Sequence, residues 1–211
     1  MKKLHTTKLI VLLAMIVLIA SCDKDENGAL TGSSGTEKVK TTLTGRLIDE
    51  TGNAVAGAIV ELDGITTTTD IMGLFLFKNV DVNKKRCVIN FSKSGYIDQY
   101  YACKPSAGNV TYTKPVMLAH ESTQNINAAT GGSVSLSAGG TVQFASNSFV
   151  NETGTLYSGT VTVKMTLLNS DDTNFSSKIP GRDLHAKDFS GTDKILYSYG
   201  MMNVELFGQS S

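Results

Sequence analysis

Short runs of alternating apolar and polar residues are the feature that most constrains how this chain can fold. No stretch after residue 22 keeps the 3.6-residue apolar period of an amphipathic helix. The clearest run covers residues 159–167, where Val161, Val163 and Met165 occupy every second position and polar residues stand between them. Because successive side chains of a strand point to opposite faces of a sheet, this period predicts an all-β fold.

The predicted strands fall into two groups, which we interpret as two tandem β-sandwich modules, residues 40–119 and 123–211. Strands are predicted in the first module at 41–49, 58–62, 74–77, 87–92, 97–103 and 110–118, with a short edge strand at 66–69. Strands are predicted in the second module around 134–136, 142–144, 159–167 and 201–207. Many short strands separated by turn residues are typical of β-sandwiches.

Glycine and aspartate residues between these strands indicate tight turns in the first module. Gly52 and Gly73 stand where a reversing backbone favours a positive φ, and Gly95 occupies the turn of a predicted hairpin. Asp49 and Asp70 each precede a glycine by three residues, which lets their carboxylates accept hydrogen bonds from the amides of the turn. The sequence therefore predicts structural turns at these positions.

Three motifs of the first module form a more specific pattern. The run GRLIDETGNAVAGAIV at 45–60 is followed by TDIMGLF at 69–75 and by SGY at 94–96, and Gly57 leaves room for close strand packing. This pattern resembles the carboxypeptidase regulatory-like domain, which often has Pro where Ala54 stands. The resemblance implies a seven-stranded, transthyretin-like β-sandwich that serves as a folding, spacing or binding module and has no peptidase activity.

The second module carries a looser resemblance. GGSV at 131–134, GTVQF at 140–144, NSF at 147–149 and GTVTV at 159–163 are similar to a β domain that often follows regulatory-like modules in bacterial surface proteins. More distantly they resemble the β domain shared by zonula-occludens, ankyrin and netrin-receptor proteins. Self-cleaving variants of that domain need a His-Phe-Ser site, which this sequence lacks, so we infer no cleavage.

The first 22 residues have the organisation of a lipoprotein signal. Lysines precede an unbroken apolar run of 12 residues, 9–20, which is too short to span a membrane. The motif IASC at 19–22 resembles the bacterial lipobox, whose cysteine is acylated and becomes the N-terminus once the preceding segment is removed. We therefore predict a signal helix over 1–21 and a lipid on Cys22. An ordinary signal peptide or an uncleaved anchor is the alternative.

A charged and polar segment follows the predicted lipidation site. Lys24, Asp25 and Glu26 resemble the export signal of Bacteroidota-type lipoproteins, which directs proteins to the outer face of the outer membrane. A solvated charge run on a periplasm-facing anchor is the alternative. The range 22–39 is otherwise polar and aperiodic, which predicts a flexible tether. Without residues 1–21 the net charge is −3, which argues against polyanionic partners and against nucleic acid.

The two cysteines beyond Cys22 suit an oxidising compartment. Cys87 and Cys103 stand at equal distances from Gly95 in the sequence. Antiparallel pairing across that turn would place the two thiols opposite each other on one sheet face. Export makes a disulfide between them reasonable, and two buried, unbonded thiols are the alternative. Neither cysteine has a neighbouring His or CxxC spacing, so we expect no thiol catalysis.

Motifs of catalysis and metal binding are absent from the sequence. It has no G-x-S-x-G elbow, no phosphate-binding loop and no dinucleotide motif. No acid follows His120 by three residues, and His185 and Asp188 would point to opposite faces of a strand. The acidic run 171–174 lacks the spacing of a calcium loop. We therefore expect no enzyme activity, no metal site and no cofactor.

Tyr100 is the candidate ligand contact. Alternation places it on the outer face of its predicted strand, away from Tyr101, where its ring can stack on a sugar. Packing of these tyrosines against the sandwich is the alternative.

Together these features predict a non-enzymatic lipoprotein of the outer membrane, exposed at the cell surface, whose two modules bind or scaffold. Its expected partners are the membrane, through the lipid, and an envelope protein, a matrix component or a glycan. One alternative is a glycan-binding accessory protein. Another is the anchoring front part of a longer protein, because the predicted strand 201–207 has no returning strand after it.

Overall fold

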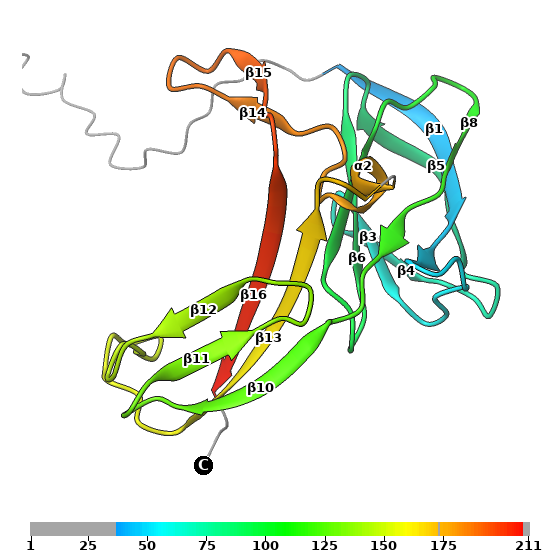
Figure 1. Ribbon diagram of the computed structural model, residues 1–211. Helices are drawn as coiled ribbons and strands as arrows, with labels where there is room; N and C mark the ends of the chain where they lie inside the picture. The colour runs from blue at the N-terminus through cyan, green and yellow to red at the C-terminus, as the bar shows by residue number, and fades with distance from the viewer. Residues whose placement is uncertain (1–36, 173, 209–211) are drawn as a thin grey trace, which may run out of the picture. The chain divides into compact units, whose positions relative to one another are not determined.

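The computed structural model describes residues 37–172 and 174–208 of the chain (Figure 1). In these residues the regular structure consists of strands, apart from the single helical turn α2 (Phe175–Lys178). The predicted all-β fold is therefore confirmed. The predicted signal helix and most of the predicted tether lie outside the described residues, and strand β1 begins at Lys38. Within the described part of the chain, no helix is long and apolar enough to cross a membrane.

The strands of the first module form two sheets. One sheet has the order β5 (Leu74–Asn83), β1 (Lys38–Arg46), β8 (Val110–Thr113). The other has the order β4 (Ile65–Thr68), β3 (Ile59–Leu62), β6 (Cys87–Ser92), β7 (Gln99–Cys103). A short parallel pair consists of β2 (Ile48–Asp49) and β9 (Val116–Met117). β1 runs antiparallel to β5 and parallel to β8.

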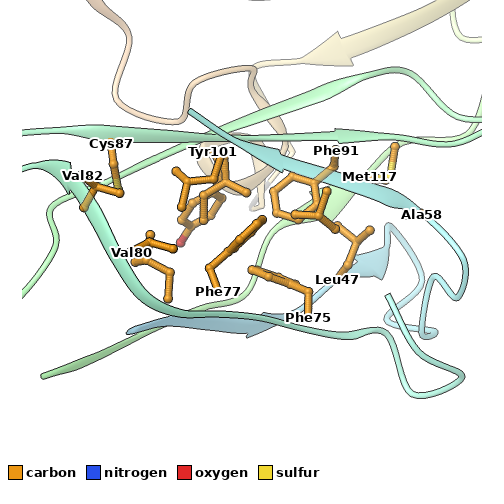
Figure 2. Close-up of a cluster of buried hydrophobic side chains, with 14 of the residues drawn as sticks. Leu47, Ala58, Phe75, Phe77, Val80, Val82, Cys87, Phe91, Tyr101 and Met117 are labelled. Carbon is orange, nitrogen blue, oxygen red and sulfur yellow. The ribbon is translucent and has the colours of Figure 1, made fainter. Parts of the chain in front are cut away.

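Side chains from both sheets fill the space between them (Figure 2). Phe75 and Phe77 of β5 point toward Phe91 of β6. The rings of Phe75 and Phe91 meet edge to face, with 5.2 Å between their centroids. Leu43 of β1 and Ile89 of β6 are completely buried. Burying each such side chain contributes about 1.5–3 kcal/mol before conformational entropy is subtracted, so this closed core holds the first module together.

A β-bulge makes β5 longer than the predicted strand 74–77. The buried positions change from odd to even numbers between Phe77 and Val80. Asn79, which lies between them, has a φ of 55°, and the register of β5 against β1 shifts at this point. The extra residue returns the following apolar side chains to the core, so β5 continues to Asn83.

The second module contains one three-stranded antiparallel sheet and two hairpins. The sheet has the order β10 (Ser122–Asn127), β13 (Thr160–Asn169), β16 (Gly200–Gly208). One hairpin consists of β11 (Gly132–Ser135) and β12 (Thr141–Phe144), and the other of β14 (His185–Lys187) and β15 (Asp193–Ile195). Val134 of β11 and Val163 and Met165 of β13 are completely buried in one cluster. The hairpin β11–β12 is therefore packed against the three-stranded sheet.

A third apolar cluster joins the two groups of strands. Ile97 and Leu118 of the first module pack with Leu168 and Ile179 of the second. Each of these side chains is buried. Each module thus has its own core, and the two modules share a small apolar contact. The exact domain boundaries stay a prediction.

Candidate functional site

The predicted anchor and export signal lie outside the described residues. This applies to Cys22 and to Lys24, Asp25 and Glu26. Lipidation and surface export therefore stay predictions from the sequence.

Cys87 and Cys103 are direct partners in the pairing of β6 with β7. Their Sγ atoms lie 2.8 Å apart and both thiols are free, whereas a disulfide bond is about 2.05 Å long. The hydrogen bond between the two thiols lowers the pKa of Cys87 and raises that of Cys103. The register brings the thiols together as expected for a cross-strand pair, and the disulfide stays a prediction.

The four glycines predicted to lie in turns of the first module all have positive φ. The angles are 90° at Gly52, 66° at Gly57, 76° at Gly73 and 90° at Gly95. A Cβ at Gly73 would collide with the carbonyl oxygen of Leu47, so this turn also requires a residue that has no side chain.

Aspartate and asparagine side chains close the same kind of turn in both modules. The carboxylate of Asp70 accepts hydrogen bonds from the amides of Met72 and Leu74, each at 2.8 Å. Asn151 and Asp188 make the equivalent bonds to the amides two and four residues later. Each of these three residues precedes a glycine by three positions, a spacing that the sequence already displays. The turns at Asn151 and Asp188 were missed by our sequence reasoning.

The histidines have different surroundings. The His120 side chain is only 7% exposed, and its Nε2 lies 3.6 Å from a carboxylate oxygen of Glu205. Its Nδ1 has no hydrogen-bond partner among the described residues. Burial lowers the pKa of His120, so the imidazole is neutral near pH 7. His120 lines a groove of about 880 Å³ together with Asp98 and Lys164, so this groove has mixed charge.

His185 does not combine with Asp188. Instead, its Nε2 lies 3.2 Å from Asp193 across the β14–β15 hairpin, and Asp193 also accepts Lys187 at 3.1 Å. A hydrogen bond and the charge of Lys187 lower the pKa of Asp193. In the residues that the structure describes, no group of three or more His, Cys, Asp or Glu side chains could hold a metal ion.

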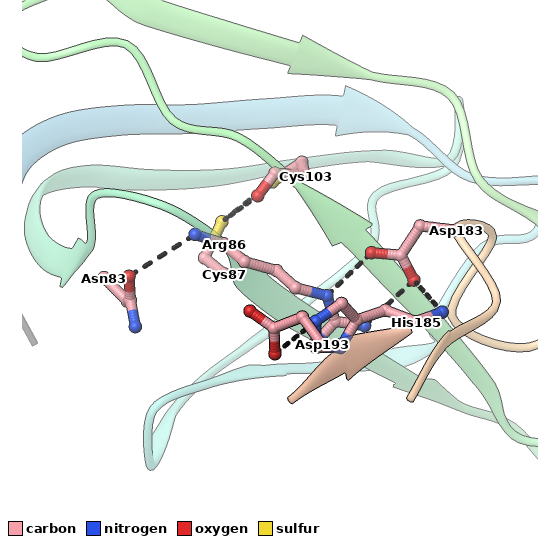
Figure 3. Close-up of polar contacts among 7 residues, drawn as sticks. All are labelled: Asn83, Arg86, Cys87, Cys103, Asp183, His185 and Asp193. Atoms are coloured by element: carbon pink, nitrogen blue, oxygen red, sulfur yellow. Dashed lines mark hydrogen bonds and ion pairs between the residues drawn. The ribbon is translucent and has the colours of Figure 1, made fainter. Parts of the chain in front are cut away.

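A basic hollow of about 580 Å³ lies beside Cys103. Four cationic side chains, one carboxylate and two tyrosines line it: Lys85, Arg86, Lys104, Arg182, Asp183, Tyr101 and Tyr112. Two of these residues form the ion pair shown in Figure 3, in which Arg86 Nε donates to Asp183 at 2.7 Å and Arg86 Nη2 donates to the other carboxylate oxygen at 3.1 Å. Arg86 lowers the pKa of Asp183, so this carboxylate stays ionised and neutralises Arg86.

The segment 179–184 carries Arg182 to the hollow. The amide of Gly181 donates to the carbonyl of Tyr100 at 2.7 Å, which attaches this segment to the free side of β7. Arg182 then has a φ of 62°, and its Nη1 donates to the Tyr101 hydroxyl at 2.6 Å. Its guanidinium also stacks over the Tyr101 ring, 5.2 Å from the centroid.

Our sequence reasoning did not anticipate this hollow. The run Lys84-Lys85-Arg86 is a visible basic signal, but Arg182 reaches it from the second module across a long sequence separation. Tyr100, the predicted ligand contact, is 46% exposed on the same strand as buried Tyr101. It does not line the basic hollow.

A second notable feature is the exposed apolar segment, residues 189–207. Its members with exposed apolar side chains are Phe189, Ile195, Leu196, Tyr197, Tyr199, Met202, Val204, Leu206 and Phe207. Tyr197 and Tyr199 are 93% and 94% exposed. In β16, Val204 and Leu206 stand opposite the buried Met165 and Val163 of β13, so they belong to the core face of the sheet but remain partly uncovered.

Comparisons with known proteins give little beyond this geometry. No family model matches the chain, and no curated protein matches it. Among solved structures, a chain of a type II cohesin–X-dockerin complex from Acetivibrio cellulolyticus has 22% identity and a TM-score of 0.31, covering 38% of this chain and 59% of that one. The Bacillus anthracis TIE protein has 9% identity and a TM-score of 0.35, covering 81% of this chain and 44% of that one.

A streptococcal ancillary pilin has 9% identity and a TM-score of 0.30, covering 78% of this chain and 60% of the pilin. This chain thus spans less than two thirds of each of these proteins. At such TM-scores the similarities carry no argument about function.

Proposed function

We propose that this protein is a non-enzymatic lipoprotein of the bacterial outer membrane, displayed on the cell surface, whose β modules bind or scaffold an envelope protein. The anchor in this proposal is an acyl-modified Cys22, and the first module is a carboxypeptidase regulatory-like domain. The coarser part of the proposal, a β-strand protein with a binding surface, rests on the described residues. The anchor and its location rest on the sequence motifs at 19–26.

The exposed apolar segment is the observation that carries the binding role. Large apolar side chains are usually buried, and a segment that leaves nine of them exposed is a candidate interaction site. Phe189, Tyr197 and Tyr199 bring aromatic rings, which are enriched at protein interfaces. A partner that covers these rings would remove them from water, and this burial would drive binding.

The proposed anchor explains how such a surface would be held at the membrane. Each buried CH₂ of an acyl chain contributes about 0.8 kcal/mol, so two or three chains would hold the protein almost irreversibly. The polar segment after Cys22 would then separate the β modules from the membrane.

The anchor is tested by growing a bacterium that expresses the full chain with a clickable palmitate analogue. We expect label on the wild-type protein and on Cys87→Ala, which serves as a matched control, and none on Cys22→Ala. Protease treatment of intact cells then reports surface display. An unlabelled wild-type protein would contradict the anchor, and a labelled protein that survives protease would contradict surface display.

The binding role is tested separately by a photo-crosslinking amino acid placed at Tyr197 in living cells. Ile71 is the matched control, because it is 85% exposed and apolar but lies in a turn of the first module. We expect a discrete adduct with an envelope protein from position 197 and none from position 71. Equal patterns at both positions, or hydrolase turnover by the purified protein, would contradict the proposal.

A further inference from the structure

Uncompensated positive charge gathers in the basic hollow, although the chain is acidic once residues 1–21 are left out. Arg86 is neutralised by Asp183, the one carboxylate that lines the hollow. Lys85, Lys104 and Arg182 line it too, and no ion pair joins any of them to a carboxylate among the described residues. Three cations that face one hollow repel one another, and an anion between them would relieve that repulsion.

Contacts with Tyr101 hold the Arg182 side chain in a defined position. Its backbone adopts a left-handed conformation, which is uncommon for a residue with a side chain and is concentrated at functional sites. Tyr101 holds the guanidinium through one hydrogen bond and by stacking. Among the described residues, only Nη1 of Arg182 donates a hydrogen bond to the protein. The Nε and Nη2 donors are therefore free to bind a ligand. A fixed guanidinium matches the two oxygens of a carboxylate or sulfate.

An aromatic wall adds a second kind of contact. Tyr112 of β8 lines the hollow and is 61% exposed, so its ring is available to the apolar face of a sugar. The volume of about 580 Å³ lies within the usual range for small-ligand sites, about 300–1,000 Å³. A ring beside three cations suits a sugar that carries an acidic group.

We propose that the basic hollow binds an acidic polysaccharide. The carboxylate or sulfate ester of one sugar unit lies between Arg182, Lys85 and Lys104, and the sugar ring stacks on Tyr112. No residue of the exposed apolar segment lines this site, and the site does not depend on the lipid anchor, so it goes beyond the proposed function. The net charge of −3 argued against polyanionic partners in the sequence analysis. A chain with this net charge can still carry a local site for an anion.

Binding is tested with the purified full chain in detergent, by calorimetry against polygalacturonate, chondroitin sulfate and neutral dextran. We expect binding to one or both acidic polymers, and the two arms separate a carboxylate from a sulfate ester. Dextran is not expected to bind. Affinity should fall at least tenfold in Arg182→Gln and in Lys85→Gln/Lys104→Gln, and should fall in Tyr112→Ala. Lys78→Gln is the matched control, because Lys78 is exposed and does not line the hollow.

Several results would overturn the proposal. One is the absence of binding to both acidic polymers, and another is equal loss of affinity in Lys78→Gln and in the hollow variants. Equal binding of single-stranded DNA would indicate a general polyanion surface and would also contradict the proposal. If Arg182→Gln fails to fold, the exposed pair Lys85→Gln/Lys104→Gln decides the question. Failure here leaves the anchor and crosslinking tests unaffected, so the two proposals fail separately.

Discussion

The two modules bury the apolar faces of their strands to different degrees. In the first, two sheets enclose Phe75, Phe77 and Phe91, and the core is closed. In the second, one hairpin packs on a three-stranded sheet, and the edge strand β16 keeps Val204 and Leu206 partly exposed. Both modules follow the same period of alternation. The number of strands in the covering layer, rather than the pattern of one strand, therefore decides whether an apolar face becomes core or surface.

Truncating one large side chain in each module should show the largest difference. Phe91→Ala removes a buried ring from the closed core and should cost about 3–5 kcal/mol. Leu206→Ala, at a position that is 47% exposed, should cost less than about 1 kcal/mol. Urea unfolding of the two variants measures the difference. Similar costs would mean that β16 is covered as well as β6.

A matched pair of methionines sharpens the comparison inside the second module. Met165 of β13 is completely buried, whereas Met202 of β16 is 38% exposed. We expect Met165→Ala to cost about 2–4 kcal/mol and Met202→Ala about 1 kcal/mol or less. Thermal unfolding of both variants checks this. A larger loss in Met202→Ala would contradict the open edge.

The shared turn motif offers a comparison at the level of the backbone. Gly73 and Gly154 both have positive φ, but of the two only a Cβ at Gly73 would collide with backbone, at the carbonyl of Leu47 between β1 and β2. Gly154→Ala should cost about 1–2 kcal/mol for the left-handed conformation. Gly73→Ala should cost about 1–3 kcal/mol more, because Leu47 has to move. Equal unfolding midpoints for the two variants would argue against a tighter first module.

The smallest expected effect concerns the ion pair between the modules. Arg86 lowers the pKa of Asp183 below its ordinary value, so this pair stabilises the folded state above about pH 4, and the contribution is lost as the pH falls through the lowered pKa. Asp183→Asn should lose less than about 1 kcal/mol at pH 7, because both side chains are partly exposed. It should also lose less stability than the wild type on acidification. Parallel pH profiles would show that the pair contributes nothing.

Local alternation predicted most of the long strands, but it missed β10, β14 and β15 and failed where the backbone of β5 changes its period. The strand 87–92 was predicted with the bounds that β6 has, because its buried and exposed positions alternate throughout. The prediction ended this strand at Phe77, whereas β5 continues to Asn83. The bulge at Asn79 interrupts the alternation of apolar and polar residues, so the strand appears to end there in the sequence. A bulge leaves little signal in one sequence.

The candidate site was largely beyond sequence reasoning. The Cys87–Cys103 pairing followed from symmetry about one turn, which is local information. Arg182 reaches Tyr101 through a segment attached to β7, and no local pattern shows such a tertiary contact. The sequence did contain a signal for the β14–β15 hairpin, because Asp188 precedes a glycine by three residues, as Asp70 does.

Hydrogen exchange of the full chain, followed by mass spectrometry, tests the contrast between the modules most directly. The account predicts that amides of β6, a central strand in a closed module, exchange more slowly than those of the edge strand β16, by on the order of 100-fold. Equal protection of β6 and β16 in the isolated protein would contradict an open second module. The binding role assigned to residues 189–207 would then lose its structural basis.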